Sequence, residues 1–394
     1  MPTLTSPTVT IDTPQIQGSS AQRFDTVDMM RGLATLAVIL THSFIHTRAA
    51  GFKLNAGMPP WLEQLVLRNG DNGVHIFFAI SGFLITFTSV KRFGSLGAMQ
   101  PLRFYRIRFA RIAPMLLLLL AVLTAMHKAH IAGYVIDANR ESLRGALLSA
   151  LTFNLNWYEA LHGYLPANWG VLWSLSVEEM FYLFFPLLCF ALARNRRSLA
   201  PFVALLCLFM ALGPFARTVW SMNRIWRDQS YLGAMDAIAM GCLTALLAVR
   251  FQRRPVSDRT LLSLQVAGAF VLLWMMIQPQ TFLVTSGLDR TIVPLATCLI
   301  TFASVLRNRR GAAWTTPLRW FGTHSYEVYL THEFVVLGGV ALLVRIHHGP
   351  VQLWAAGFVL ATAPVGWLLA KSFSEPINRT LRGNPHNSPR IQSA

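Results

Sequence analysis

The sequence predicts an all-α protein that crosses a membrane about ten times, and three observations support this fold class. Of the 394 residues, 54% are hydrophobic and only 13% are charged, whereas soluble domains carry about 25% charged residues. The apolar residues form long runs, each about long enough to cross a hydrocarbon core of about 30 Å. The basic residues cluster in short loops between these runs. Together these features predict a polytopic transmembrane helical bundle.

Ten apolar runs can be assigned as membrane helices. They lie near 33–48, 73–90, 110–126, 171–191, 199–219, 233–249, 261–278, 291–306, 323–344 and 351–371. We expect a disordered leader over 1–23, a membrane domain over 24–382 and a polar tail over 383–394. The leader has no apolar segment of its own, so no cleaved signal is expected. The stretch 145–158 is too short and interrupted to span, which favours a re-entrant or interfacial helix in an outer loop.

The Lys and Arg residues predict which side of the membrane each loop faces. If the N-terminus is cytoplasmic, the loops on that side hold an excess of basic residues of roughly two to one. The bias holds in every such loop, so we expect the orientation N-in and C-in. The formal net charge of +17 could also indicate nucleic-acid binding. Its confinement to short membrane-flanking loops argues against nucleic acid and favours membrane lipid as the partner.

Ionisable residues in the first run are the strongest indication of function. Asp28 and Arg31 lie at its start, and His42 lies inside it. Eleven residues of helix rise about 16 Å in about three full turns, so Arg31 and His42 share one face. An ionisable group at bilayer depth costs a few kcal/mol unless protein or water surrounds it. We therefore expect this face to line a functional site, with a structural histidine bonded to a neighbouring helix as the alternative.

Two adjacent glutamates make the fourth run the most unusual in the chain. Glu178 and Glu179 follow Ser174 and Ser176. Neighbouring residues project about 100° apart on a helix, so the two carboxylates cannot face one partner. We expect one glutamate to bind a hydroxyl group and the other to pair with a histidine or an arginine. A structural ion pair would explain one buried carboxylate better than it explains two.

Further polar residues at membrane depth are Ser81, Asp236 and His332. The pair Ser81–Gly82 lets another backbone come close, and Asp236 could equally form a bond between helices. The four cysteines all lie in apolar runs without metal-ligand spacing, so they are interpreted as core residues and no metal site is expected.

A basic loop is expected between the second and third runs. Its arginines, Arg103, Arg106, Arg108 and Arg111, alternate with aromatic residues. Arginine pairs with phosphate through two parallel hydrogen bonds, which predicts a site for a phosphate-rich cytosolic cofactor. The alternative is that these charges only set the membrane topology.

Five stretches, in order, resemble motifs of the acyltransferase 3 family. They are Asp28-x-x-Arg31-Gly32 with His42, Phe77-Phe78-x-x-Ser81-Gly82-Phe83-Leu84, Trp173-Ser174-Leu175-Ser176-Val177-Glu178-Glu179-x-Phe181-Tyr182, Ser325-Tyr326-x-x-Tyr329-Leu330-x-His332, and Glu375-Pro376. The resemblance implies a multi-pass O-acyltransferase of the bacterial inner membrane, with acyl-CoA, by default acetyl-CoA, as donor. The implied acceptor is a hydroxyl of a carbohydrate or glycolipid, and polysaccharide-synthesis proteins are possible partners.

The resemblance also implies roles for individual residues. His42 would act as general base on the acceptor hydroxyl, or carry the acyl group itself. Arg31 would orient the donor or stabilise charge on the thioester oxygen, and Glu178 or Glu179 would orient the histidine or bind the acceptor. The four arginines of the basic loop would hold the CoA phosphates.

The sequence departs from the family pattern in three respects. The family commonly has an acid where His75 stands, and often an arginine where Ala234 stands. We expect no appended extracytoplasmic hydrolase-like domain of the kind that some members carry, so a second step would need a partner protein.

Two other functions compete with the acyltransferase interpretation. A secondary transporter for a lipid-linked sugar or small polar solute would also place polar residues in a helical bundle. It would commonly show internal repeats and interrupted helices. A non-catalytic scaffold would explain the helices but not the buried acids.

Overall fold

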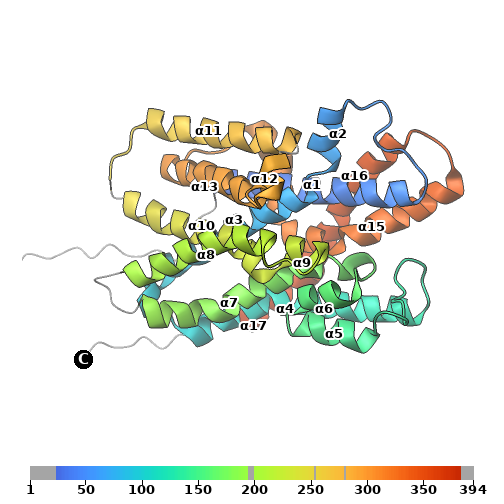
Figure 1. Ribbon diagram of the computed structural model, residues 1–394, viewed down its shortest axis with the longest axis horizontal. Helices are drawn as coiled ribbons and strands as arrows, with labels where there is room; N and C mark the ends of the chain where they lie inside the picture. The colour runs from blue at the N-terminus through green and yellow to red at the C-terminus, as the bar shows by residue number, and fades with distance from the viewer. Residues whose placement is uncertain (1–23, 194–198, 253, 279–280, 383–394) are drawn as a thin grey trace, which may run out of the picture.

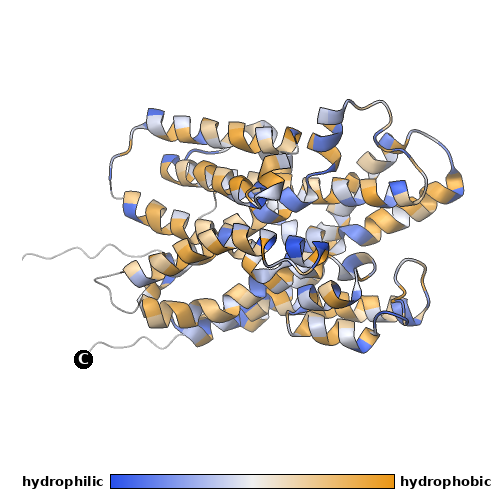
Figure 2. Ribbon diagram, in the orientation of Figure 1, coloured by the Kyte–Doolittle hydropathy of each residue, from blue (hydrophilic) through white to orange (hydrophobic). Residues whose placement is uncertain are grey.

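The computed structural model describes residues 24–193, 199–252, 254–278 and 281–382 (Figure 1). All regular structure in these ranges is helical, with no strand, which confirms the predicted all-α class. The expected leader over 1–23 and tail over 383–394 lie outside the described residues. The long helices run roughly side by side, and hydrophobic residues predominate along them (Figure 2).

Each of the ten predicted runs overlaps one long helix. These helices are α1 (Asp25–Ala49), α3 (Gly70–Phe93), α4 (Pro101–Lys128), α7 (Leu172–Leu192), α8 (Ala200–Thr218), α10 (Tyr231–Phe251), α11 (Asp258–Ile277), α13 (Asp289–Arg307), α15 (Ser325–Ile346) and α16 (Val351–Leu369). The shorter helices are α2 (Pro60–Leu67), α5 (Leu143–Leu151), α6 (Leu155–His162), α9 (Arg224–Gln229), α12 (Thr281–Thr285), α14 (Thr316–Thr323) and α17 (Glu375–Arg382). Single turns are η1 (Leu96–Ala98), η2 (Ala167–Trp169), η3 (Ala313–Thr315) and η4 (Ala370–Ser374).

Nine helical segments within the described ranges are long and apolar enough to cross a membrane, which makes this a multi-pass membrane protein. The helix α1 is not among them although it has 25 residues. Its polar side chains lower its mean hydropathy, and it packs against α3, α14, α15 and α16. The predicted count of ten spans therefore corresponds to nine apolar helices and one polar helix among them.

The arginines between the second and third runs lie on a helix, so the prediction of a loop there was wrong. The helix α4 begins at Pro101, about three turns before the apolar run. Proline is favoured in the first turn of a helix because its missing N–H would have no intrahelical partner. The first three turns of α4 therefore hold the four arginines on a rigid element.

Glycine contacts fix α1 against α14. Gly32 of α1 lies against the carbonyl oxygen of Leu318, and Gly322 of α14 lies against the carbonyl oxygen of Asp28. A Cβ atom at either glycine would overlap the facing backbone, so only glycine permits this approach. Because α15 follows α14 directly, these contacts also position α15 beside α1.

Glycine contacts fix α3 against α10 in the same way. Gly82 lies against the carbonyl oxygen of Ile238, and Gly241 lies against that of Ala79. The Ser81–Gly82 pair thus allows the close backbone approach that the sequence predicts.

The stretch 145–158 falls on two short helices, α5 and α6, of nine and eight residues. Neither is long enough to span a membrane. Glu159 of α6 is fully buried, and its Oε1 accepts a hydrogen bond from the Leu165 N–H at 3.1 Å. Burial disfavours the charged form and raises the pKa of Glu159 to about 8.

Candidate functional site

A cavity of about 460 Å³ lies beside the first half of α1. We call it the arginine cavity, because Arg31, Arg108, Arg111 and Arg382 line it. The other polar residues in its lining are Asp28, Ser81, Thr88, Ser174, Glu178, Tyr182, Thr323, His324, Ser325, Tyr326, Glu327, Tyr329, Ser374, Glu375 and Asn378. Five helices, α1, α3, α4, α7 and α15, supply the walls, and α17 closes one side.

The arginine cavity offers guanidinium groups to an anion. Arg108, Arg111 and Arg382 form no ion pair within the described part of the chain. Arg108 instead lies over the ring of Tyr182, with its Cζ 4.2 Å from the ring centroid. The helix α4 turns Arg103 and Arg106 to the exterior, so two of the four arginines predicted to bind the cofactor line the cavity and two do not.

Arg31 lies at the junction of α1 and α15. Its Nη2 donates a hydrogen bond to Ser325 Oγ at 2.7 Å, and its Nη1 lies 3.9 Å from Asp28 Oδ1. A guanidinium held from two sides has a fixed direction, so it can stabilise negative charge that develops in the cavity.

The adjacent glutamates of α7 face different surroundings, as the helix geometry predicts. Glu178 lines the cavity and accepts a hydrogen bond from Tyr182 at 3.2 Å. Tyr182 also bonds Ser81. Glu179 is buried outside the cavity lining, and its Oε1 has no hydrogen-bond partner within the described residues.

The two serines of this motif also differ. Ser174 Oγ lies 2.7 Å from the hydroxyl of Tyr329, which lines the cavity. Ser176 donates to the carbonyl of Leu172 at 3.1 Å, a bond within its own helix, and does not reach the cavity.

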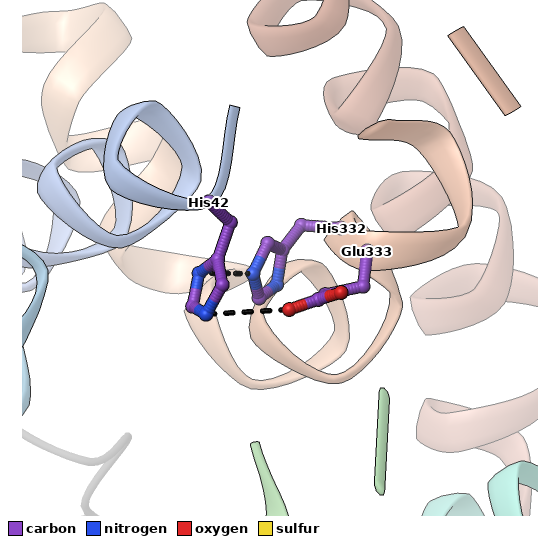
Figure 3. A group of neighbouring side chains, drawn as sticks. All are labelled: His42, His332 and Glu333. Atoms are coloured by element: carbon purple, nitrogen blue, oxygen red, sulfur yellow. Dashed lines mark hydrogen bonds and ion pairs between the residues drawn. The ribbon is translucent and has the colours of Figure 1, made fainter. Parts of the chain in front are cut away.

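His42 belongs to a second group, the histidine cluster, formed by His42, His46, His332 and Glu333. Figure 3 shows His42 extending from α1 toward His332 and Glu333 of α15. His42 Nε2 lies 3.2 Å from Glu333 Oε1, and His46 Nε2 lies 3.0 Å from Glu333 Oε2. His42 Nδ1 lies 3.1 Å from His332 Nε2. Arg31 and His42 thus both face α15, in keeping with the predicted shared face of α1.

The cluster is buried on the α15 side and open on the α1 side. His332 is fully buried, and the Glu333 side chain is only 5% exposed. The side chain of His42 is 26% exposed, which leaves the ring accessible. The ring centroids of Tyr329 and His332 lie 5.9 Å apart, and Tyr329 also lines the arginine cavity. Tyr329 therefore lies between the cavity and the histidine cluster.

Asp236 lies in a separate network. Its Oδ2 accepts hydrogen bonds from Arg217 Nη2 at 2.7 Å and Thr291 Oγ1 at 2.6 Å. Arg217 of α8 thus supplies the cation that the resemblance would place at Ala234. Both charged side chains are buried, and neither lines the cavity, so this pair joins α8, α10 and α13. The structure favours the structural alternative for Asp236.

Sequence reasoning missed Arg382, His46 and Glu333 as site residues. Arg382 reaches the cavity because α17 packs against α4, and no motif marks it. His46 follows His42 by four residues, and Glu333 follows His332 directly. The first spacing places both histidines on one face of α1, which was a usable signal.

Ligand atoms of His42, His332 and Glu333 lie within 4.8 Å of one another, a spacing that a metal ion could bridge. However, His42 contacts His332 through Nδ1 and Glu333 through Nε2, on two sides of its ring. The two contacts therefore form a chain through the ring and do not converge on one point, as the ligands of a single ion would.

Comparisons with known proteins find similar relatives and one family. The chain is 26% identical over 334 residues to the peptidoglycan O-acetyltransferase OatA of Listeria monocytogenes, covering 79% of this chain and 49% of that protein. It is 25% identical to the O-acetyltransferase OatA of Staphylococcus aureus, covering 79% of this chain and 50% of that protein. The chain thus spans about half the length of these relatives. No solved structure matches it.

A family model described as an acyltransferase domain matches residues 24–371. The match runs from the start of α1 through α16, and so includes the histidine cluster and all of the arginine cavity except its α17 side. The chain belongs to the acyltransferase 3 family.

Proposed function

We propose that the protein is a membrane O-acyltransferase that transfers an acetyl group from acetyl-CoA to a hydroxyl of a cell-surface carbohydrate or glycolipid. One observation carries the proposal: α1 joins a cavity, three of whose arginines form no ion pair within the described residues, to an accessible histidine held by a carboxylate. Along the helix, Arg31 and His42 are separated by about 16 Å. An extended donor could therefore place its phosphates near the arginines and its acyl group near His42.

The arginine cavity is proposed to bind the nucleotide end of acetyl-CoA. Arg108, Arg111 and Arg382 have no ion-pair partner among the described residues, so they could pair with phosphate groups. Arginine suits this role because its planar fork matches two phosphate oxygens. The aromatic face of Tyr182 lies in the same lining, and its hydroxyl bonds Glu178.

His42 is proposed to take the proton of the acceptor hydroxyl. Its ring is accessible and lies next to buried partners that fix its orientation. Imidazole suits a general base because its ordinary pKa is near neutrality. Arg31, about 16 Å away along α1 and held by Ser325 and Asp28, would orient the donor in the arginine cavity.

The acceptor is proposed to be a polysaccharide, because both relatives are named as O-acetyltransferases and one name specifies peptidoglycan. The proposed location is the bacterial inner membrane with both termini in the cytoplasm. The excess of basic residues in the loops on that side supports this orientation. The arginine cavity would then face the cytosol, where acetyl-CoA is made.

The test compares purified wild-type protein with His42→Ala in detergent, using acetyl-CoA and a panel of glycans. Loss of a general base typically costs about 10²- to 10⁴-fold in rate. The matched control is His162→Ala, since His162 is exposed and, among the described residues, its hydrogen bond and its ring contact are both to Tyr158 of its own helix. We expect acetyl transfer in the wild type and the control and its loss in His42→Ala.

A folded wild-type protein that neither binds CoA nor turns it over would contradict the proposal. That result would favour a transporter, and the arginines would then serve only topology. An active His42→Ala protein would instead refute the role of the histidine and leave the enzyme class intact.

A further inference from the structure

The hydrogen-bond partners of the histidine cluster determine where its protons lie. His332 Nδ1 lies 2.7 Å from the carbonyl oxygen of Tyr329, and His42 Nδ1 lies 3.0 Å from that of Val38. A carbonyl oxygen can only accept, so each Nδ1 carries a hydrogen. His332 Nε2 then shares the His42 Nδ1 hydrogen with the Val38 carbonyl, at 3.1 Å from that nitrogen, while His332 remains neutral.

The remaining contact requires one more hydrogen. His42 already carries its hydrogen on Nδ1, so a neutral ring has only a lone pair on Nε2. That nitrogen lies 3.2 Å from Glu333 Oε1, and an ionised carboxylate also offers only lone pairs. Two acceptors repel at this distance unless a proton lies between them. Glu333 Oε2, for its part, accepts from His46 Nε2 at 3.0 Å.

We propose that Glu333 keeps an additional proton on His42, so that the His42–Glu333 pair enters the reaction as an acid. This inference rests on the proposed function. The acceptor oxygen first adds to the thioester carbon, and the pair gives its proton to the CoA sulfur as the bond between carbon and sulfur breaks. The pair, now without its extra proton, then takes the former hydroxyl proton from the new ester oxygen. The products are the acetylated acceptor and CoA thiol, and the pair ends the cycle with its original proton.

Glu333 is therefore a positioning residue that acts through His42. It does not line the arginine cavity, so it has no contact with the proposed phosphate site. Its side chain is 5% exposed, and a buried carboxylate needs a paired cation or a proton. A protonated His42 supplies this partner, which explains why an acid is tolerated at this depth.

The variant Glu333→Gln separates this role from a structural one. A glutamine has the same shape, and its amide N–H can donate to His42 Nε2 while its oxygen accepts from His46. Both contacts then persist with neutral rings, so the fold should not change. The matched control is Glu159→Gln, which removes another buried carboxylate, outside both the cavity and the cluster.

The first measurement is the ¹⁵N NMR spectrum of histidine-labelled protein in detergent near neutral pH, with the His42 signals assigned by comparison with His42→Ala. We expect His42 to carry hydrogens on both nitrogens in the wild type and in Glu159→Gln, and only on Nδ1 in Glu333→Gln. A neutral His42 in the wild type would overturn the proposal, whether or not the protein proves to be an acetyltransferase.

The second measurement is steady-state turnover. We expect Glu333→Gln to lower kcat by at least about tenfold, with an unchanged KM for acetyl-CoA, because only proton transfer is affected. Unchanged kcat in Glu333→Gln would overturn the proposal. So would a stoichiometric metal ion in the purified wild type that His332→Ala loses, since a metal would then hold the cluster together.

Discussion

Replacing Arg108 by alanine should weaken donor binding without disturbing the fold. Arg108 lines the arginine cavity and forms no ion pair in the described part of the chain, so its loss breaks no ion pair there. Arg106, two positions earlier on α4, is exposed and lies outside the cavity lining. Arg106→Ala is therefore a matched control with the same change in charge.

The expected size of the effect follows from one lost contact to phosphate. A hydrogen bond to a charged group contributes about 1.5–3 kcal/mol. Arg108 is only partly buried, so the lower end applies, and about 1.5 kcal/mol corresponds to about a tenfold higher KM for acetyl-CoA. Arg106→Ala should change KM by less than about twofold, because an exposed charge is screened by water and salt.

The assay measures release of free CoA thiol by the purified variants over a range of acetyl-CoA concentrations. Direct binding of CoA by calorimetry gives the same comparison independently of the acceptor. An equal rise in KM for both variants would refute the assignment of Arg108 to the phosphate site, because the rise would then follow from the lower net charge of the protein. An unchanged KM in Arg108→Ala would show that the phosphates lie elsewhere.

Three further predictions concern stability. Asp236→Asn leaves Arg217 buried beside a neutral group and should destabilise the protein by about 3 kcal/mol or more; a melting temperature equal to wild type would contradict this. Gly241→Ala forces a methyl group against the carbonyl of Ala79 and should cost about 1–3 kcal/mol, measured as a lower melting temperature. Glu159→Gln should change the stability little at pH 5 and should stabilise the protein relative to wild type as the pH rises to 8. Because the pKa of Glu159 is raised to about 8, the free energy of unfolding of the wild type falls by up to about 1.4 kcal/mol per pH unit between the ordinary pKa of a glutamate and about 8. Equal melting temperatures of Glu159→Gln and wild type at both pH values would count against that ionisation.

The helices and the residues of α1 could be predicted because their signals are local. Long apolar runs determine helix positions, and the spacing of Arg31 and His42 determines that they share a face. The separation of Glu178 from Glu179 also followed from helix geometry. These inferences need only the period of a helix and the cost of polar groups in lipid.

The partners of these residues could not be predicted, because they depend on which helices pack together. Glu333 contacts His42 only because glycine contacts bring α14, and α15 behind it, against α1. Arg217 finds Asp236 because α8 packs on α10. Arg382 enters the cavity through the packing of α17 on α4. No sequence spacing encodes these pairings.

The single helix that carries both Arg31 and His42 also fixes the distance between them. The number of residues between them sets their separation, and a thicker or thinner bilayer tilts the helix without changing that length. In the proposed reaction the donor therefore meets the same span in any membrane. The CoA moiety of every acyl-CoA is the same, so a fixed distance between Arg31 and His42 suits the donor. The acceptor would then be selected at the exposed side of the histidine cluster. Acceptor preference could thus diverge among relatives while the donor site stays unchanged.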